Sequence, residues 1–364
     1  MKLTAAVKLQ PTADQHDMLR ETLERANAAC EWMSEQAWVQ KAFSQSALHK
    51  FTYYAARERF GLGAQMAVRC IGKVLDAYKL DKRRQRHFRP HGAISYDSRI
   101  LNWRLDDRRV SIWTLGGRIE VAFTGGPSHL ELLKFQQGES DLVYRNGKFY
   151  LYATCDIPDE TPIDPEGFLG ADMGVTNILT DSDGTIYSAK HLLNVRQRHR
   201  RLRRKLQAKG TKSAKRRLKD LSGKERRFAA DVNHCISKQL VNTAKGTGRG
   251  IAVEDLTHIR SRVTVGRRKR DTLHSWSFAQ LRQYITYKAQ RAGVPVQVVD
   301  ARYTSQECSC CGHTSRSNRP NQATFKCQSC GFASHADWNA AVNISRRGAV
   351  NHPHAVGVLG LNPA

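Results

Sequence analysis

Two short apolar stretches, FLGAD at residues 168–172 and GIAVE at residues 250–254, each end in an acidic residue. Their length and their small or branched apolar residues are typical of buried β-strands. A third acid, Asp337, lies near the start of the helical stretch DWNAAVNISRR, whose apolar residues can pack inward. Two acids at strand ends and one at a helix start can meet at the edge of one sheet. These stretches predict an α/β unit that brings Asp172, Glu254 and Asp337 together.

The three acids form a chemically useful set. Hard divalent ions prefer carboxylate oxygen, and Mg²⁺ typically uses a few carboxylates together with water and substrate phosphate. Two ions about 4 Å apart can activate an attacking water and stabilise the leaving oxygen of a phosphodiester. Taken singly, each acid has a simpler role: Asp172 as a turn residue, Glu254 as part of a cap for the next helix, and Asp337 as an N-cap. The set, rather than any one acid, favours a site for Mg²⁺ (or Mn²⁺).

Five of the nine cysteines lie between Cys308 and Cys330. The pair Cys308 and Cys311 is separated by fifteen residues from the pair Cys327 and Cys330, which is the spacing of a zinc ribbon with four thiolate ligands. A closed set of four thiolates leaves no open position for chemistry, so we expect this Zn²⁺ to be structural. Cys310 is an additional thiol that competes with its neighbours for the metal, and His313 is a weaker candidate ligand. The other cysteines are scattered and suggest no disulfide framework.

The chain is strongly basic, with 59 Lys and Arg against 33 Asp and Glu and a formal charge of +26. Such an excess predicts a polyanionic partner, and nucleic acid is the default. Residues 190–227 hold 17 Lys or Arg and only two acids, with leucines recurring among the charges. We expect two amphipathic helices joined near Gly210, with one side packed and the other facing phosphates, although a solvated surface is the alternative. The candidate phosphate-binding residues there are Arg200, Arg201, Arg203, Arg204, Lys205, Arg216 and Arg217.

The first hundred residues are predicted to be mostly helical. Residues 1–10 alternate like a short strand, and Thr12 with Gln15 offers a capping box for a helix through about Val39. A second helix is expected from about Gly63 to Leu80. It places Gln65, Arg69 and Lys73 at four-residue spacing on one side, and a basic run that includes Arg83 and Arg84 follows it.

Residues 94–157 carry short β-rich stretches separated by Gly-Gly and Gly-Pro turns. Asn146-Gly147 lies between two such stretches and predicts a hairpin. We expect a small antiparallel sheet or barrel here. The stretch DIPDETPIDPEG at residues 156–167 is rich in proline and acid, which is typical of a linker, and a second unit begins after it. A further hairpin is expected over Val175 to Tyr187.

The sequence has no stretch of about 18 consecutive apolar residues, the length that a membrane span needs. Its N-terminal MKLTAAVKLQP lacks the apolar block of a signal peptide. We therefore expect a cytoplasmic protein with no membrane partner, associated with the nucleoid of a prokaryotic cell.

Four motifs occur in the order seen in the TnpB family of transposon-encoded, RNA-guided endonucleases, which are related to type V CRISPR effectors. They are Gly170-Ala171-Asp172-Met173-Gly174, Val253-Glu254-Asp255-Leu256, the stretch at 303–312 and the stretch at 335–341. The resemblance implies a multidomain α/β protein with an RNase H-like (RuvC) nuclease, an inserted zinc ribbon, a helical recognition lobe and a small β-barrel wedge domain. The implied boundaries are residues 1–10 and 93–157 for the wedge, 11–92 for recognition, 158–167 for a linker, and 168–364 for the nuclease, with basic helices at 190–245 and the ribbon at 303–334.

The resemblance also implies roles for particular residues. Asp172, Glu254 and Asp337 would be the metal-binding catalytic triad of a metal-dependent endodeoxyribonuclease. Gln65 lies in the recognition helix at the position where family members contact a short motif flanking the target. The implied partners are a guide RNA and target DNA, and protein partners are unknown. A compact type V CRISPR effector would share every motif, and a non-catalytic zinc-ribbon repressor that binds nucleic acid is an alternative of another class.

Overall fold

The computed structural model describes residues 1–256 and 278–351. The chain divides into two compact units, Met1–Pro158 and Asp159–Ala364. None of the helices in these described ranges is both long enough and apolar enough to cross a membrane.

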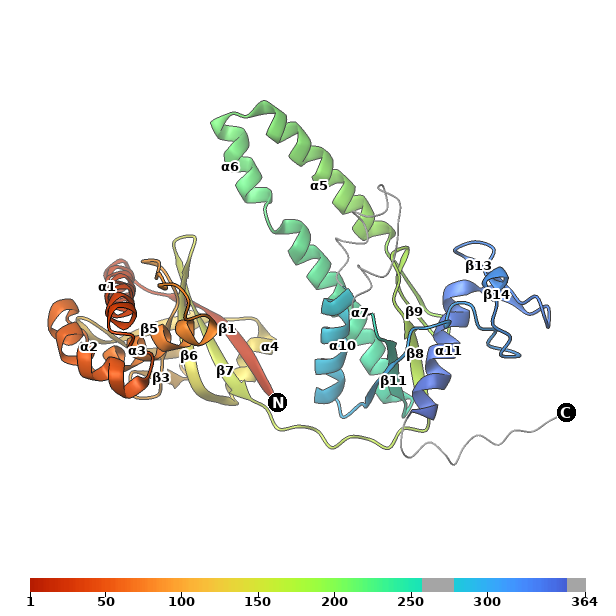
Figure 1. The fold of residues 1–364 in the computed structure, drawn as a ribbon, viewed down its shortest axis with the longest axis horizontal. Helices are drawn as coiled ribbons and strands as arrows, with labels where there is room; N and C mark the ends of the chain where they lie inside the picture. The colour runs from red at the N-terminus through yellow and green to blue at the C-terminus, as the bar shows by residue number, and fades with distance from the viewer. Residues whose placement is uncertain (257–277, 352–364) are drawn as a thin grey trace. The chain divides into compact units, whose positions relative to one another are not determined.

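The first unit contains a seven-stranded sheet in which every pairing is antiparallel (Figure 1). Its strands are β1 (Lys2–Gln10), β2 (Ile94–Tyr96), β3 (Leu101–Arg104), β4 (Arg109–Thr114), β5 (Gly117–Thr124), β6 (Gln136–Arg145) and β7 (Lys148–Asp156), in the order β2-β6-β7-β1-β5-β4-β3. The hairpin expected at Asn146-Gly147 is confirmed between β6 and β7. The N-terminal strand lies in the middle of the sheet, where it joins two halves that are distant in sequence.

Side-chain hydrogen bonds draw the two ends of this sheet toward each other. Trp103 Nε1 on β3 donates to Ser140 Oγ on β6 (3.3 Å), and the Tyr96 hydroxyl on β2 donates to the carbonyl of Trp113 on β4 (3.3 Å). The sheet is therefore strongly curved, although β2 and β3 remain its two edges.

Three long helices, α1 (Ala13–Val39), α2 (Gln45–Phe60) and α3 (Ala64–Leu80), and the short α4 (Pro127–Leu133) complete the first unit. The capping box of Thr12 and Gln15 is confirmed at the start of α1. α2 was not predicted from the sequence; it follows the Ser44 cap and is closed by Gly61 in the left-handed conformation. Only Leu48, Thr52 and Ala56 of α2 are buried, so it lacks the broad apolar stripe by which helices are recognised.

The second unit is built on a mixed five-stranded sheet in the order β10-β9-β8-β11-β12. The strands are β8 (Phe168–Asp172), β9 (Asn177–Asp181), β10 (Ile186–Ser188), β11 (Gly250–Glu254) and β12 (Val296–Val299). β8, β11 and β12 run parallel, while β9 pairs antiparallel with β8 and β10. The expected strands at 168–172 and 250–254 and the expected hairpin of β9 and β10 are confirmed.

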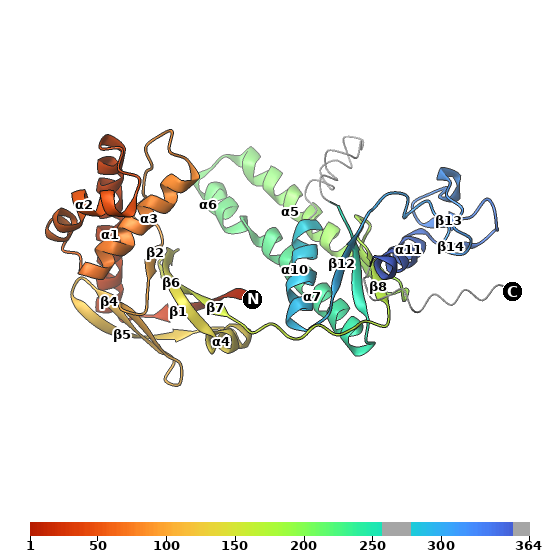
Figure 2. The ribbon, with the colours of Figure 1, turned by 60° about the horizontal axis from the view of Figure 1, so that its bottom comes forward.

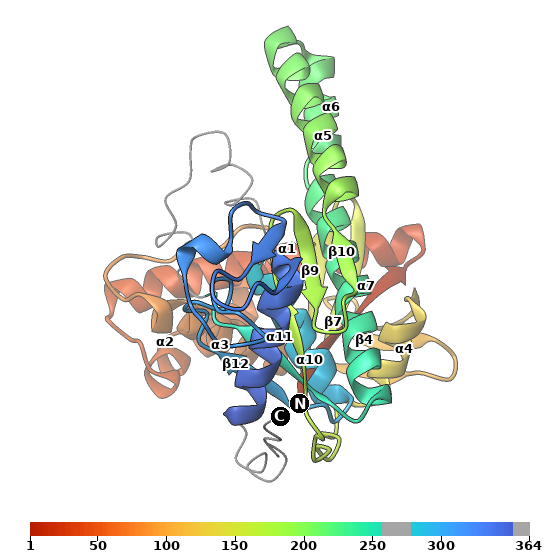
Figure 3. The ribbon, with the colours of Figure 1, turned by 90° about the vertical axis from the view of Figure 1, so that its right-hand side faces the viewer.

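Helices cover both faces of this sheet (Figure 2). α7 (Lys224–Gly246) and α10 (Phe278–Arg291) pack on the face that carries Leu169 and Val253, and α11 (Ala336–Val350) packs on the face that carries Phe168 and Ala252. Alternate residues of a strand point to opposite faces, so the two sets follow from one-residue steps along β8 and β11. α5 (Lys190–Lys209) and α6 (Lys212–Leu221) extend away from the sheet as a helical hairpin (Figure 3), joined at Gly210 as expected.

Gly170 allows α11 to approach β8 closely. A Cβ atom on Gly170 would lie 1.9 Å from the Ala341 carbonyl oxygen of α11, which no side chain can tolerate. A glycine in the middle of the strand therefore determines how near the helix lies to the two strand ends.

Candidate active site

Asp172 and Glu254 lie at the ends of adjacent parallel strands. β8 and β11 pair in register, with Val253 opposite Ala171, so the two acids that follow are neighbours. Both point to the α11 face, because Gly170 and Ala252, two residues earlier on each strand, meet α11. α11 carries Asp337 in its first turn. The structure thus brings together the three acids from three separate segments of the chain.

Asp172 is not a turn residue and Asp337 is not an N-cap. Asp172 is within the β8–β9 ladder, opposite Thr180. The N-cap of α11 is His335, and Asp337 is its second helical residue. The possible cap formed by Glu254 concerns residues after 256, which lie outside the described part of the chain. Glu254 itself is buried within β11.

Glu254 and Asp337 are buried and held by neighbouring side chains, whereas Asp172 is partly exposed. Glu254 is 7% exposed and Asp337 9%. The Thr304 hydroxyl donates to the Glu254 carboxylate. Asn177 Nδ2 donates to Asp337 Oδ2 (2.9 Å), and Arg319 Nη2 donates to Asp337 Oδ1 (3.0 Å). Partners from β9, the β12–ribbon connection and the ribbon itself therefore orient two of the three carboxylates.

Crowding of the acids alters their titration. Burial first, and then the charges of Glu254 and Asp337, raise the pKa of Asp172 well above its usual value, while the Arg319 guanidinium opposes the shift. Burial also raises the pKa of Glu254, against the hydrogen bond from Thr304. Raised pKa values favour the protonated forms of Asp172 and Glu254, and divalent ions bound there would compete with those protons. This donor set fits hard divalent ions, whose charge would relieve the repulsion.

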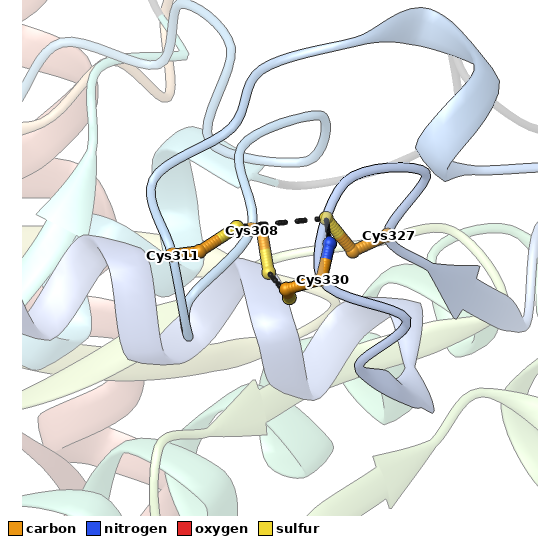
Figure 4. Close-up of side chains that lie close together, drawn as sticks. All are labelled: Cys308, Cys311, Cys327 and Cys330. Atoms are coloured by element: carbon orange, nitrogen blue, oxygen red, sulfur yellow. Dashed lines mark hydrogen bonds between the residues drawn. The ribbon is translucent and has the colours of Figure 1, made fainter.

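The four spaced cysteines form a second, closed cluster (Figure 4). Their sulfur atoms all lie within 4.8 Å of one another, with Cys308 and Cys330 at 3.7 Å and Cys311 and Cys327 at 3.6 Å. A tetrahedron of sulfurs around Zn²⁺, with Zn–S bonds of about 2.3 Å, has edges of about 3.8 Å. These cysteines therefore fit a tetrahedral zinc site. Within residues 1–256 and 278–351 they are the one group of three or more His, Cys, Asp or Glu whose ligand atoms lie close enough together to hold an ion, and the three acids do not form such a group.

The thiols of the cluster are shifted in different directions: the pKa of Cys308 and of Cys330 is raised, whereas that of Cys327 is lowered. Burial acts to raise the pKa of Cys327, but hydrogen bonds from the backbone N–H groups of Cys330 and Ser329 outweigh it and lower that pKa to about 6. The thiolate is the form that binds a metal. Cys310 and His313 are exposed and lie outside the cluster, so neither belongs to the four-ligand set.

The ribbon is fastened to α11 by two buried asparagines one turn apart. Asn339 Nδ2 donates to the Glu307 carbonyl (2.7 Å), and its Oδ1 accepts from the backbone N–H of Ser309 (2.9 Å). Asn343 Nδ2 donates to the carbonyls of Thr304 (3.0 Å) and Glu307 (2.7 Å). The ribbon, with β13 (Thr324–Lys326) and β14 (Ala333–His335), is therefore part of the framework around the acids.

The candidate residues of α3 are engaged inside the first unit. Gln65 donates to Asp97 and accepts from Arg99 Nη1, the latter at 3.1 Å. Arg69 forms an ion pair with Glu139 on β6. Lys73 Nζ donates to Asn27 Oδ1 (2.6 Å). These contacts place the polar edge of α3 against the sheet and α1.

Arg83 and Arg84 behave differently. Both are highly exposed, and both lie near Asp81, with Nε–carboxylate distances of 3.2 and 3.4 Å. Hydrogen bonds from Arg83 lower the pKa of Asp81 to about 2, so this carboxyl remains ionised. The pair presents guanidinium groups to solvent beside α3.

The candidate phosphate-binding residues of the helical hairpin are all exposed. These are Arg200, Arg201, Arg203, Arg204 and Lys205 on α5, and Arg216 and Arg217 on α6. Arg203 forms an ion pair with Glu225 of α7 (2.6 Å). The hairpin thus carries an exposed basic surface on a packed leucine face, as in the expected amphipathic arrangement.

Sequence reasoning missed three residues of the site: Asn177, Thr304 and Arg319. Each contacts an acid that is distant in the sequence. The spacing of residues along the chain therefore does not distinguish Arg319 from the many other arginines. Thr304 had a partial signal, because it follows β12 and precedes the first cysteine pair.

The chain was compared with protein families, curated proteins and solved structures. A family described as "Cas12f1-like, TNB domain" matches residues 278–344, and one described as "Probable transposase" matches residues 152–259. The chain is 33% identical over 233 residues to the CRISPR-associated endodeoxyribonuclease Cas12f1 of Sulfoacidibacillus thermotolerans, covering 58% of this chain and 54% of the relative.

Two further relatives carry different names. The chain is 29% identical over 222 residues to the putative RNA-guided DNA endonuclease InsQ of Escherichia coli K12, covering 56% of this chain and 54% of the relative. It is 30% identical over 207 residues to the TnpB-like protein MJ0751 of Methanocaldococcus jannaschii, covering 52% of this chain and 73% of the relative. The chain thus spans about half the length of the Cas12f1 and InsQ relatives.

Solved structures share the fold. A chain of the Cas12f1-sgRNA-target DNA complex superposes with a TM-score of 0.59 at 17% identity, covering 90% of this chain and 82% of that chain. The mini-RNA-guided endonuclease CRISPR-Cas_phi3 superposes with a TM-score of 0.55 at 10% identity, covering 96% and 92%. At these identities the likeness concerns the fold alone.

Proposed function

Since this chain belongs to the TnpB family, we propose that it is an RNA-guided DNA endonuclease that hydrolyses phosphodiester bonds at Asp172, Glu254 and Asp337. The observation that carries this proposal is the proximity of three acids from β8, β11 and α11, of which Glu254 and Asp337 are buried and Asp172 is partly exposed. Divalent ions bound there would activate water and stabilise the leaving oxygen.

The protein's own residues would prepare that chemistry. Thr304 and Asn177 hold the carboxylates of Glu254 and Asp337 in fixed orientations, so fewer rearrangements are needed when cations enter. Arg319 neutralises part of the acidic charge, and its guanidinium has the fork geometry that suits a phosphate oxygen. Burial of the acids limits competing water around the reacting phosphate.

The finer fold assignments are part of the proposal. The mixed sheet order β10-β9-β8-β11-β12, with α11 on one face, supports an RNase H-like (RuvC) nuclease in residues 168–364. The curved antiparallel sheet supports a wedge barrel formed by residues 1–10 and 93–157, around the recognition helices of 11–92. Residues 158–167 have no helix or strand, which supports a linker. Residues 257–277 and 352–364 of the nuclease lie outside the described ranges.

The basic surfaces are the proposed binding sites for the RNA and DNA partners of this function. We assign guide-RNA binding to the exposed residues of α5 and α6 and to the recognition helices, with Arg69, Lys73, Arg83 and Arg84 as nucleic-acid-binding residues there. Contact with the DNA that flanks the target is assigned to Gln65. Neutralising Arg200, Arg201 and Arg204 together should weaken RNA binding. Each lost phosphate contact should flatten the dependence of log K on log salt by about 0.7 for single strands. An unchanged slope would make these arginines a solvated surface.

The decisive experiment begins with the RNA that co-purifies with the full chain. A structured RNA that ends in a variable segment should direct Mg²⁺-dependent cleavage of a plasmid library carrying the matching sequence, and only next to a short fixed motif. The matched control is Asp172→Ala, which should retain the RNA and leave the library intact. Cleavage that ignores the RNA would contradict guidance, and RNA-dependent binding without cleavage would favour the repressor.

A compact type V CRISPR effector is the second candidate, favoured by the likeness to Cas12f1 at 33% identity. The same RNA distinguishes the two. A guide whose constant part matches a CRISPR repeat would assign the chain to that class, whereas one that matches a transposon end would assign it to the transposon-encoded class.

A further inference from the structure

A buried hydroxyl beside Asp172 has no hydrogen-bond partner among the described residues. Thr180 on β9 is 0% exposed, and its Oγ1 is both inaccessible to solvent and unpaired. Thr180 lies directly opposite Asp172 in the antiparallel pairing of β8 and β9. Directly opposed residues lie on the same face of a sheet, with Cβ atoms about 4.5–5.5 Å apart. The Thr180 hydroxyl therefore shares the α11 face with the carboxylate of Asp172.

The unpaired hydroxyl completes a pattern in the acid site. Glu254 receives a hydrogen bond from Thr304, and Asp337 receives one from Asn177. Within the described ranges, no side chain donates a hydrogen bond to Asp172, although burial and the charges of Glu254 and Asp337 all raise its pKa. Buried polar groups without partners are uncommon and call for an explanation. Here an unpaired donor and an unpaired acceptor occupy opposed positions on neighbouring strands.

We propose that Thr180 is a positioning residue: its hydroxyl, which makes no hydrogen bond in this structure, would donate to Asp172 when a divalent cation is bound and so orient that carboxylate. The inference rests on the proposed metal role of Asp172. A carboxylate that binds a cation through one oxygen presents the other to an outer partner, and such partners fix its orientation. Thr180 suits this task because a β-branched side chain has few rotamers, so its hydroxyl direction is restricted by the strand.

The test compares Thr180→Val with Thr180→Ser in the full-length, zinc-loaded chain without RNA. Binding of Mn²⁺ is measured by electron paramagnetic resonance, which reads free against bound ion and does not depend on cleavage. Thr180→Val should weaken Mn²⁺ binding by about 10- to 100-fold, whereas Thr180→Ser should retain it. Thr286→Val on α10 is the control, because its exposed hydroxyl donates to the Arg282 carbonyl within that helix, outside the acid site. It should bind Mn²⁺ as the wild type does.

A second measurement separates orientation from packing. Valine has nearly the shape of threonine and removes an unpaired buried hydroxyl, so the melting temperature of Thr180→Val in EDTA should equal or exceed that of the wild type. A lower melting temperature together with weaker binding would make Thr180 a packing residue and overturn the proposal.

Asp172→Asn identifies which idea fails. If Asp172→Asn weakens Mn²⁺ binding and Thr180→Val does not, the role of Thr180 is wrong while the metal site stands. If Asp172→Asn itself binds Mn²⁺ as the wild type does, the metal role of Asp172 is wrong, and the inference about Thr180 falls with it.

Discussion

The cysteine cluster and the acid site both lie near the start of α11, but they are built in opposite ways. The four sulfurs lie within 4.8 Å of one another in the arrangement of a zinc tetrahedron, and Ala336 of α11 packs against Cys308 and Cys327. The acids are held in mutual repulsion, with the pKa of Asp172 and Glu254 raised mainly by burial. A structural metal site stabilises the fold when its metal binds. In a reactive site, the carboxylates repel one another until cations and substrate bind.

The largest effect should come from removing an acid. Asp172→Ala or Glu254→Ala should reduce Mg²⁺-dependent cleavage by about 10³-fold or more, because several kcal/mol of charge stabilisation in the transition state is lost. Single-turnover cleavage of labelled target DNA measures this, and RNA binding should be nearly unchanged. Undiminished cutting by both variants would remove these acids from the mechanism.

Arg319 connects the two sites and should have the next largest effect. Arg319→Gln keeps a hydrogen-bond donor but removes the charge beside Asp337, so cleavage should fall by about 10²-fold, the usual loss when one donor is removed from a charged transition state. Arg316→Gln, which changes a nearby ribbon arginine, is the control and should cleave normally. Equal rates for the two variants would show that Arg319 serves only the ribbon.

Breaking the cysteine cluster should act on stability first. Cys327→Ser removes one of four ligands from a segment with a core of only a few buried residues, so residues 303–334 should become sensitive to protease and the chain should melt at a lower temperature. Cys310→Ser is the matched control, because Cys310 is exposed and outside the cluster. Protease resistance of the Cys327→Ser ribbon equal to that of the control would contradict a structural zinc site.

The smallest effect should be a gain of stability in the metal-free acid site. A carboxyl whose pKa is raised by folding binds its proton more tightly in the folded state, so folding stability falls as pH rises from the unfolded pKa through the folded one. Asp172→Asn should therefore melt a few degrees above the wild type at pH 7 to 8 in EDTA, and the difference should vanish near pH 4.

Asp183 is a control in which folding changes the pKa in the opposite direction, because its pKa is lowered rather than raised. Its hydrogen bond to Arg249 lowers its pKa, so the stability that it contributes is present above the unfolded pKa and is lost as pH falls. Asp183→Asn should be slightly destabilising at neutral pH, and less so in acid. If the two asparagine variants shifted melting in the same direction, the shift would not report on charge repulsion.

The sequence predicted local features better than the contacts between them. The strands at 168–172 and 250–254, the helical hairpin joined at Gly210 and the capping box of α1 follow from composition, periodicity and turn residues, and all are present. The central place of β1 in its sheet does not follow, because pairing with β7 and β5 depends on residues more than a hundred positions away.

The candidate site shows the same division. Strand ends and a helix start placed each of the three acids, but the order of the motifs in the family that the chain resembles selected them as a set, and their role as metal ligands stays a prediction. Arg319, Thr304 and Asn177 enter the site only because Asn339 and Asn343 fasten the ribbon to α11 and because β9 folds back beside β8. Such contacts depend on the packing of distant segments, which one sequence alone does not specify.

Thr304, near the start of the ribbon, and Asp337, just after its end, are both parts of the acid site, so the two ends of this insertion lie at that site. The segment between them meets the acids directly through Arg319. The ribbon is therefore an insertion that contacts the acid site at three residues: Thr304, Arg319 and Asp337. A redesigned ribbon would have to keep the four cysteines, the contacts of Glu307 and Ser309 with α11, and the contact of Arg319 with Asp337.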